Sequence, residues 1–332
     1  MLKFAIIGTN WITDWWINSA HASKRWQLVA VYSRTKEAGE SFAEKYNVST
    51  IYTSIPDLIA AKDVDTVYVA SPNSLHYQHA KELLEGGKNV VLEKPATSTV
   101  AELDELFEIA HKKGVFLIEA YRHIHEVNFK VLKKAVLEDK KLGPIYGASL
   151  TFASFSSRYH NVLAGERPNI FTLDFSGGSL VDVGVYPVAF AVALFGKPKS
   201  QTYQAFICPT GVDGGGFILL QYDTFSVQIN QSKVFTSNAP SEIYGEKGTL
   251  SINGTADIAS VQFRSNKTKE TEDLAKPKAE KNMQEEADEI GRIILEKDKT
   301  AAASLEQLSK DILAVTTDLR KQNGVVFKVE QK

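Results

Sequence analysis

Cysteine is nearly absent from this chain, with Cys208 the only one among 332 residues. A single cysteine excludes an intramolecular disulfide and is typical of a reducing compartment. The net charge is only −2, which excludes a general attraction to nucleic acid or anionic membranes. We find no apolar run of membrane-spanning length and no charged leader followed by an apolar core. We therefore expect a cytoplasmic protein that binds neither nucleic acid nor membrane.

Metal-binding and nucleophile motifs are lacking as well. No cluster of Cys, His and carboxylate residues has the spacing of a zinc site, and the neighbouring His123 and His125 are better explained as loop residues. No serine stands in a nucleophile elbow. The sequence therefore predicts no metal centre and no serine hydrolase.

The pattern of strands and helices changes once along the chain, whose length suffices for two domains with sizeable cores. In residues 1–121, short apolar runs alternate with helical patterns, which predicts a doubly wound parallel sheet with right-handed crossovers. From residue 122, strand-like runs predict an α+β domain with a large open, mostly antiparallel sheet of at least six strands. A charged stretch at 266–281, expected to be a mobile loop or hairpin, precedes helices at about 282–296 and 305–321.

A glycine turn near the amino end is the first candidate for coenzyme binding. Phe4 to Gly8 is an apolar run ending in glycine, and a helical pattern follows to about Ser23, which is the context of a dinucleotide fingerprint. The fingerprint is degraded, because Asn10 and Thr13 stand where small residues are usual. Asn tolerates the left-handed conformation, so we expect the turn to survive. The motif alone also fits a generic strand–helix turn. Its expected coenzyme contacts are Gly8, Thr9, Asn10, Trp11 and Ile12.

The residues after the second strand set the choice of coenzyme. The run from Gln27 to Tyr32 reads as a strand, and an acid just after it would bind the ribose hydroxyls of NAD. Ser33 and Arg34 stand there instead, and they can accept a 2′-phosphate. The sequence favours NADP over NAD, with a plain surface role for Arg34 as the alternative.

A polar loop follows the strand predicted at Thr66 to Ala70. It reads Ser71-Pro72-Asn73-Ser74-Leu75-His76, and Ser74 can cap the helix that runs to about Gly86. Loops at the carboxyl ends of parallel strands face the ligand crevice. We expect coenzyme contacts from this loop, with His76 near the nicotinamide ribose or carboxamide; as an isolated histidine it would more often be a cap or a surface residue. The predicted contacts are Ser71, Pro72, Asn73, Leu75 and His76.

Lys94 is delivered to the same edge of the predicted sheet. The stretch from Asn89 to Glu93 reads as a buried strand, and Pro95 cannot continue it. Lys94 therefore lies at the carboxyl end of a strand, where ligands bind in open α/β sheets. On this stretch alone, a solvated strand end is equally consistent.

Two polar residues interrupt an apolar helical segment in the second half. A glycine pair precedes Ser179 as a possible cap, and the helix should run to about Phe195. Asp182 and Tyr186 are four residues apart, so both would project from one face. A buried polar pair needs partners, and a lysine from the other domain would satisfy both. The alternative is a structural hydrogen bond between Asp182 and Tyr186.

Together, three segments resemble the Gfo/Idh/MocA family of NAD(P)-dependent oxidoreductases. They are Glu93-Lys94-Pro95, the loop from Ser71 to His76, and the helix segment GGSLVDVGVYP at residues 177–187. Tyr186 stands where the family more often has histidine, as in the branch of glucose–fructose oxidoreductase and the dimeric dihydrodiol and xylose dehydrogenases. The segment Tyr32-Ser33-Arg34 is similar to NADP-preferring members of that branch.

The resemblance implies a fold, a reaction and an assembly. It implies a Rossmann domain at 1–121 and a substrate and dimerisation domain at 122–332, whose last helix (about 305–321) packs back on the first. It implies a cis peptide before Pro95, coenzyme contacts from Glu93 and Lys94, and a homodimer (or dimer of dimers) through the outer face of the second sheet. The substrate would be a small carbohydrate, polyol or vicinal diol.

For the chemistry, we expect Tyr186 to act as the acid/base, Lys94 to polarise the substrate oxygen and Asp182 to orient a hydroxyl or the lysine. Free tyrosine and lysine both titrate near pH 10, so the group that carries the proton must be tuned by its neighbours, and the reversed assignment stays open. Arg122 and His123 are expected to line the cleft. The alternatives are a dihydrodiol- or aldehyde-directed enzyme and a non-catalytic coenzyme-sensing regulator of the same fold.

Overall fold

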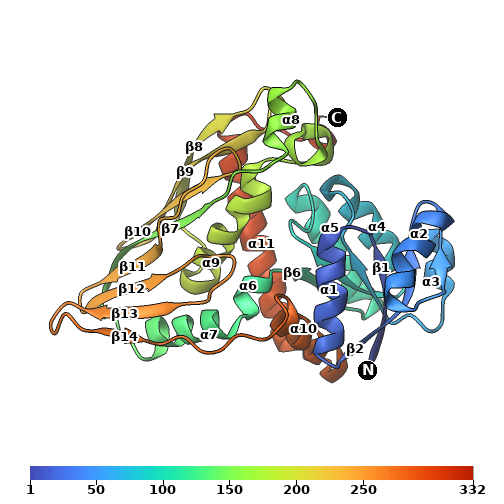
Figure 1. Ribbon diagram of the computed structural model, residues 1–332, viewed down its shortest axis with the longest axis horizontal. Coiled ribbons are helices and arrows are strands. Elements are labelled where there is room, and N and C mark those ends of the chain that lie inside the picture. The colour runs from blue at the N-terminus through green and yellow to red at the C-terminus, as the bar shows by residue number, and fades with distance from the viewer. Residues whose placement is uncertain (332) are drawn as a thin grey trace. The chain divides into compact units, whose positions relative to one another are not determined.

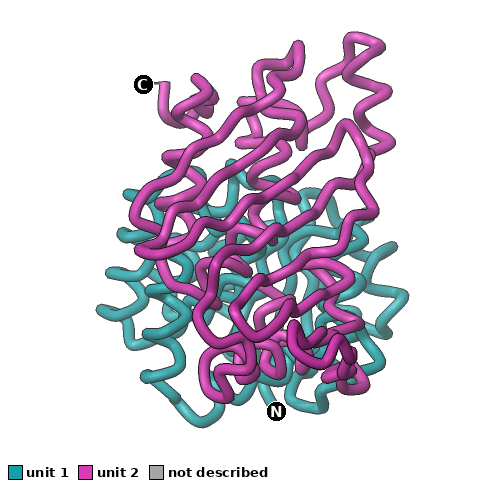
Figure 2. Tube along the Cα trace, turned by 90° about the vertical axis from the view of Figure 1, so that its left-hand side faces the viewer, with its two compact units in different colours: residues 1–120, 279–310 teal, residues 121–278, 311–332 magenta. Residues whose placement is uncertain are grey.

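The structure is a computed structural model, and it describes residues 1–331 of the chain. The chain forms two compact units, drawn in different colours in Figure 2. Unit 1 comprises Met1–Ala120 and Ala279–Lys310, and unit 2 comprises Tyr121–Lys278 and Asp311–Lys332. The sequence predicted a single division after residue 121, whereas the structure places residues 279–310 with the amino-terminal unit.

Unit 1 is built on a six-stranded sheet in the order β3-β2-β1-β4-β5-β6. Every neighbouring pair in it is parallel. Strands β1, β4 and β5 are almost wholly buried, as expected for apolar runs covered on both faces. The strands are β1 (Leu2–Ile7), β2 (Trp26–Tyr32), β3 (Ile51–Tyr52), β4 (Thr66–Val69), β5 (Asn89–Glu93) and β6 (Leu117–Ala120).

The helices of unit 1 form two groups, as doubly wound crossovers require. Helix α4 packs on α5, and α1 packs on α10. They are α1 (Trp11–Ala22), α2 (Lys36–Ala43), α3 (Ile55–Ala60), α4 (Asn73–Glu85), α5 (Val100–Lys113) and α10 (Gln284–Glu296).

Helix α10 belongs to unit 1 because its apolar stripe finds its partners there. Ala287, Ile290 and Ile293 are fully buried in one core with Trp16 and Trp26. The Trp26 indole N–H also donates to the Ala287 carbonyl oxygen at 2.7 Å. Strand-versus-helix patterning cannot reveal such a partner, because the two residues are 261 positions apart in the sequence.

Unit 2 is built on an eight-stranded sheet in the order β14-β13-β12-β11-β7-β10-β9-β8. Only the β7–β10 pair is parallel, so the sheet is mostly antiparallel, as predicted. The strands are β7 (Ile145–Ala153), β8 (Ser200–Ile207), β9 (Asp213–Gln221), β10 (Ser226–Ser232), β11 (Ser241–Gly245), β12 (Gly248–Ile252), β13 (Val261–Ser265) and β14 (Thr271–Asp273).

The helices of unit 2 lie on one face of this sheet, and Figure 1 draws α7 and α9 there. Figure 2 shows the sheet from its other face. Helix α9 and the π-turn before it pack directly on β7 and β10. The helices are α6 (Arg122–His125), α7 (Val127–Lys133), α8 (Tyr159–Leu163) and α9 (Val185–Phe195), with π-turns at Lys134–Glu138 and Leu180–Gly184. Helix α11 (Lys299–Lys321) runs from unit 1 into unit 2.

Three local predictions were wrong. Ser74 lies inside α4, whose first turn is preceded by Pro72, so Ser74 is not its cap. The run of one aspartate and three glycines at residues 213–216 is typical of a turn and predicts one, but it is the start of β9. The segment Leu173–Phe195 does reach membrane-spanning length and contains an 18-residue window with a mean hydropathy of 1.8, but 72% of that window is buried inside the protein. It has the character of a soluble protein's core helix, because a helix that is covered all round is apolar all round.

Candidate active site

The predicted coenzyme residues of unit 1 lie at one edge of its sheet. Gly8 follows β1, Ser33 follows β2, Ser71 follows β4 and Lys94 follows β5, all at the carboxyl ends of parallel strands. The strand order reverses between the parallel strands β1 and β4, and open α/β sheets bind their ligands at such a point. The four loops therefore lie at the edge of the sheet where dinucleotides bind in folds of this kind.

Gly8 and Asn10 shape the turn after β1. Gly8 has φ +106°, and a side chain there would strike the Ala70 carbonyl group at the end of β4. Asn10 is extended (φ −105°), so the left-handed conformation expected for it was wrong. Its Oδ1 accepts from the Ile12 and Thr13 N–H groups at 3.0 and 3.3 Å. Its Nδ2 donates to the Ala70 carbonyl oxygen at 3.0 Å. Asn10 is therefore the helix cap and ties β1 to β4.

The residues that would meet the coenzyme around this turn are accessible. Thr9, Asn10 and Arg34 are exposed, and Ser33 is half-buried. Trp11 is 64% exposed, and its ring meets Trp15 edge to face at 5.0 Å. A guanidinium and a hydroxyl after β2 form a donor set that suits a 2′-phosphate. The residues therefore fit NADP.

His76 holds the loop after β4 against the loop after β5. Its Nδ1 lies 2.9 Å from the Pro95 carbonyl oxygen, and its Nε2 lies 2.7 Å from the Ser71 carbonyl oxygen. The ring is 1% exposed. A second histidine, His79, which was not predicted, meets the Ser71 hydroxyl at 3.0 Å. His76 therefore links two loops through their backbone carbonyl groups. This is a structural role, whereas the sequence predicted a coenzyme contact for His76.

Burial lowers the pKa of His76 to about 4, against the opposing effect of its two carbonyl partners. The unfolded chain, with an ordinary histidine pKa near 6.5, then binds more protons than the folded chain between pH 6.5 and 4. The contribution of His76 to the free energy of unfolding should be complete above pH 6.5. As pH falls toward 4, the free energy of unfolding should decrease by about 3 kcal/mol. Urea unfolding at pH 7, 5 and 4 measures it.

His76→Gln should flatten this pH dependence relative to the wild type, while His160→Gln, at an exposed position of unit 2, should leave it unchanged. An equal loss of stability on acidification in wild type and His76→Gln would contradict the assignment.

The loop that presents Lys94 is fixed through its backbone. The Lys94–Pro95 peptide is cis, as the resemblance implied. The Lys94 N–H donates to Glu93 Oε2 at 3.2 Å, and the Ala96 N–H donates to Glu119 Oε1 at 2.7 Å. Both glutamates are buried. Glu93 also accepts from the buried Tyr68 hydroxyl at 2.6 Å. Buried carboxylates thus hold the loop, and the half-buried Lys94 side chain is presented at its edge.

In unit 2, Asp182 lies on the π-turn Leu180–Gly184, so the α-helical spacing assumed for Asp182 and Tyr186 was wrong. A π-turn inserts one extra residue and recurs at functional sites. Lys233, just after β10, donates to Asp182 Oδ2, and its side chain is only 4% exposed against 34% for Asp182. Sequence analysis missed Lys233; its only signal is a lysine directly after an otherwise uncharged strand.

Tyr186 lies on the first turn of α9 within a set of ring contacts. Its ring meets His123 at 5.2 Å and Phe152 at 5.5 Å, both edge to face. The Arg122 guanidinium lies 5.6 Å from the ring centroid and pairs with Glu126 at 3.5 Å. Unit 2 therefore places a phenol next to a cation and an imidazole, and Arg122 and His123 lie beside Tyr186.

Two family models match the chain. The model of the oxidoreductase family with NAD-binding Rossmann fold matches residues 2–121, and the model of the GFO/IDH/MocA C-terminal domain matches residues 132–251.

Relatives cover the whole chain. The uncharacterized oxidoreductase YgjR of Escherichia coli (strain K12) is 37% identical over 329 residues, 98% of each chain. The scyllo-inositol 2-dehydrogenase (NADP(+)) IolU of Bacillus subtilis (strain 168) is 37% identical over 331 residues, 100% of each. A solved structure of the 3-ketoreductase KijD10 from Actinomadura kijaniata with NADP and TDP-benzene has a TM-score of 0.81 at 21% identity, covering 96% of this chain and 98% of that one, and it shows the same fold. The chain therefore belongs to the Gfo/Idh/MocA family of oxidoreductases.

Proposed function

We propose that this protein is an NADP-dependent oxidoreductase that interconverts a hydroxyl and a carbonyl group on a sugar, polyol or vicinal diol. The observation that carries the proposal is the presentation of Lys94 by a buried, hydrogen-bonded loop at the sheet edge that also bears the dinucleotide turn. A full-length relative that is named as an NADP(+)-dependent scyllo-inositol dehydrogenase supports the substrate class.

NADP supplies the hydride chemistry when it is bound, and the protein residues hold and orient it. The turn Gly8 to Ile12 would hold the pyrophosphate near the amino end of α1. Ser33 and Arg34 would receive the 2′-phosphate. The loop from Ser71 to His76 and the Glu93–Lys94 loop would border the nicotinamide end, in keeping with their strand positions.

The choice of NADP depends on Arg34. Arg34→Ala should raise KM for NADPH by about 10- to 100-fold, as expected for losing a hydrogen bond to a charged group, and should leave KM for NADH nearly unchanged. The nearby, equally exposed Lys36 pairs with Glu40 at 3.6 Å, so Lys36→Ala is the matched control for a lost positive charge. Similar shifts for NADPH and NADH in Arg34→Ala would contradict recognition of the 2′-phosphate.

The proton and the substrate oxygen are assigned to three side chains. Tyr186 exchanges the proton with the substrate oxygen, Lys94 polarises that oxygen, and Asp182 accepts a hydrogen bond from a substrate hydroxyl. The reversed assignment gives the proton to Lys94. The position of the Tyr186 ring beside Arg122 and His123, the two residues predicted to line the cleft, supports a role for its phenol.

A turnover screen tests the function. Wild-type protein is incubated with NADP+ and either inositols, aldoses or vicinal diols, and with NADPH and the matching carbonyl compounds. Turnover confined to polyols or sugars supports the proposal. Turnover confined to aromatic dihydrodiols or aldehydes would instead indicate a dihydrodiol- or aldehyde-directed enzyme. NADPH binding without turnover on any compound would instead indicate a coenzyme-sensing regulator.

The assembly and location follow from the same reasoning. On the open face of the unit 2 sheet, Phe206, Phe217 and Leu219 are 51%, 52% and 45% exposed on the adjoining strands β8 and β9. Exposed apolar side chains on a sheet face favour pairing with a second copy. We infer a homodimer through this face, which sedimentation equilibrium tests. The single cysteine supports a cytoplasmic location.

A further inference from the structure

Lys233 is a buried ammonium group with a partner that faces outward. The residue is 3% exposed, and its Nζ lies 5.3 Å from the centroid of the buried Phe171 ring. It donates to Asp182 Oδ2. A buried charge is tolerated only when it is paired, so the pair fixes Lys233 and Asp182 together. The apolar stem and aromatic ring around Lys233 leave the carboxylate as the exposed end of the pair.

A second, wholly buried network fixes the π-turn on which Asp182 lies. Asp213 accepts from the Leu180 N–H and from the Tyr203 hydroxyl, both at 2.7 Å. The Gln231 side-chain amide donates to the Tyr203 oxygen at 2.6 Å and accepts from the Ser179 hydroxyl at 2.6 Å. Buried, mutually satisfied polar networks of this kind rigidify the backbone that they join.

The two sets of contacts converge on one strand. Gln231 and Lys233 are separated by a single residue at the end of β10, so they point to the same face. One holds the start of the π-turn, and the other holds the side chain at its centre. Because packing leaves no room there, even a methyl group at Gly184 would press on the Gln231 side chain.

We propose that Lys233 is a positioning residue that holds the Asp182 carboxylate for hydrogen bonding to a substrate hydroxyl next to the reacting carbon. This inference rests on the proposed function, since it assigns Lys233 to the substrate side of that reaction. An ionised carboxylate only accepts hydrogen bonds, which suits a polyol that offers several hydroxyl donors.

A double-mutant cycle tests the proposal with scyllo-inositol as the probe. Its dissociation constant is measured by calorimetry on protein saturated with NADPH, which requires no turnover, and kcat and KM are measured with NADP+. Lys233→Met and Asp182→Asn should each weaken scyllo-inositol binding and lower kcat/KM by about 10- to 100-fold. In the Asp182→Asn background, Lys233→Met should weaken scyllo-inositol binding and lower kcat/KM by less than about a further threefold. Lys233→Arg should recover part of the loss.

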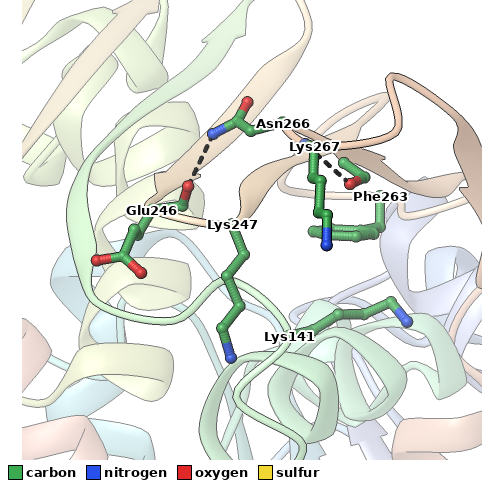
Figure 3. Close-up of a pocket in the computed structure, with 7 residues that line it drawn as sticks. Lys141, Glu246, Lys247, Phe263, Asn266 and Lys267 are labelled. Carbon is green, nitrogen blue, oxygen red and sulfur yellow. Dashed lines mark hydrogen bonds between the residues drawn. The ribbon is translucent and has the colours of Figure 1, made fainter.

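The chain offers a matched control in the hollow shown in Figure 3. Lys141 is also ion-paired, with Glu272 at 2.8 Å, and also lies by an aromatic ring, 5.1 Å from the centroid of Phe263. Lys141→Met therefore removes a lysine–carboxylate pair beside an aromatic ring elsewhere in unit 2, although a more exposed one, and the binding and kinetics of this variant should match the wild type.

The outcomes separate the two proposals. Wild-type turnover with unchanged scyllo-inositol binding in Lys233→Met overturns the positioning role alone. The positioning role is also overturned if Lys233→Met lowers binding and kcat/KM by the same factor in the Asp182→Asn background as in the wild type and also lowers the thermal midpoint. A residue that serves only the fold would behave in this way. A wild type that neither binds scyllo-inositol nor turns over any compound overturns the proposed function, and this inference with it.

Discussion

Replacing Lys94 by methionine is expected to lower kcat by about 10³-fold or more while NADPH still binds. Methionine keeps most of the length of the side chain but carries no charge, and a group that polarises or protonates the reacting oxygen contributes about 10²–10⁴-fold. The loop should stay in place, because the hydrogen bonds of the Lys94 and Ala96 N–H groups and of the Pro95 carbonyl oxygen are made by the backbone, which the substitution retains.

Stopped-flow turnover and quenching of tryptophan fluorescence measure the two effects separately. Trp11 is exposed on the turn expected to hold the coenzyme and serves as the reporter of binding. Lys81→Met is the control, since it removes an ion-paired lysine of unit 1 (2.5 Å from Glu105) outside this loop. Turnover within a factor of three of wild type in Lys94→Met would refute its role.

The second large effect is expected from Tyr186→Phe, which should lower kcat by about 10²–10³-fold if the phenol carries the proton. Phenylalanine keeps the ring contacts with His123, Phe152 and Arg122 and removes only the hydroxyl. Steady-state kinetics with NADP+ and the substrate found in the screen measure this change.

Tyr146→Phe is the matched control, because Tyr146 lies on β7 of the same unit and is 63% exposed. A loss of less than about tenfold in Tyr186→Phe, with an inactive Lys94→Met, would assign the proton to the lysine. Full activity in Tyr186→Phe would show that the phenol takes no part in the reaction.

Local patterns were sufficient for most elements of the fold. The run before Gly8 and the stretch from Asn89 to Glu93 are buried strands, as their continuous apolar residues predicted. The sequence pattern predicts a helix from about Thr99 to Lys113, and the structure has α5 there, with Thr99 as its cap in a capping box. Such features depend on neighbours within four residues, so one sequence suffices to find them.

Features that depend on contacts far along the chain were missed or misassigned. Asn10 is extended rather than left-handed because its side chain reaches Ala70, 60 residues away. Helix α10 belongs to unit 1 because it packs in the same core as Trp26. The Trp26 indole donates to the carbonyl oxygen of Ala287, which is 261 residues away in the sequence. The partner of Asp182 is Lys233, 51 residues on, after a different strand.

By itself, the sequence determined that the chain has a parallel nucleotide-binding sheet and a second, largely antiparallel sheet, and it singled out Lys94, Asp182 and Tyr186. Those conclusions rest on apolar periodicity, on where strands end and on motif spacing, all of which are local. Tertiary structure alone decided that His76 links two loops, that Asp182 lies on a π-turn, and that Lys233 donates to the Asp182 carboxylate. The physical reason is that a buried polar group takes whichever partner the packing brings within hydrogen-bonding distance, and packing joins residues that are distant in sequence.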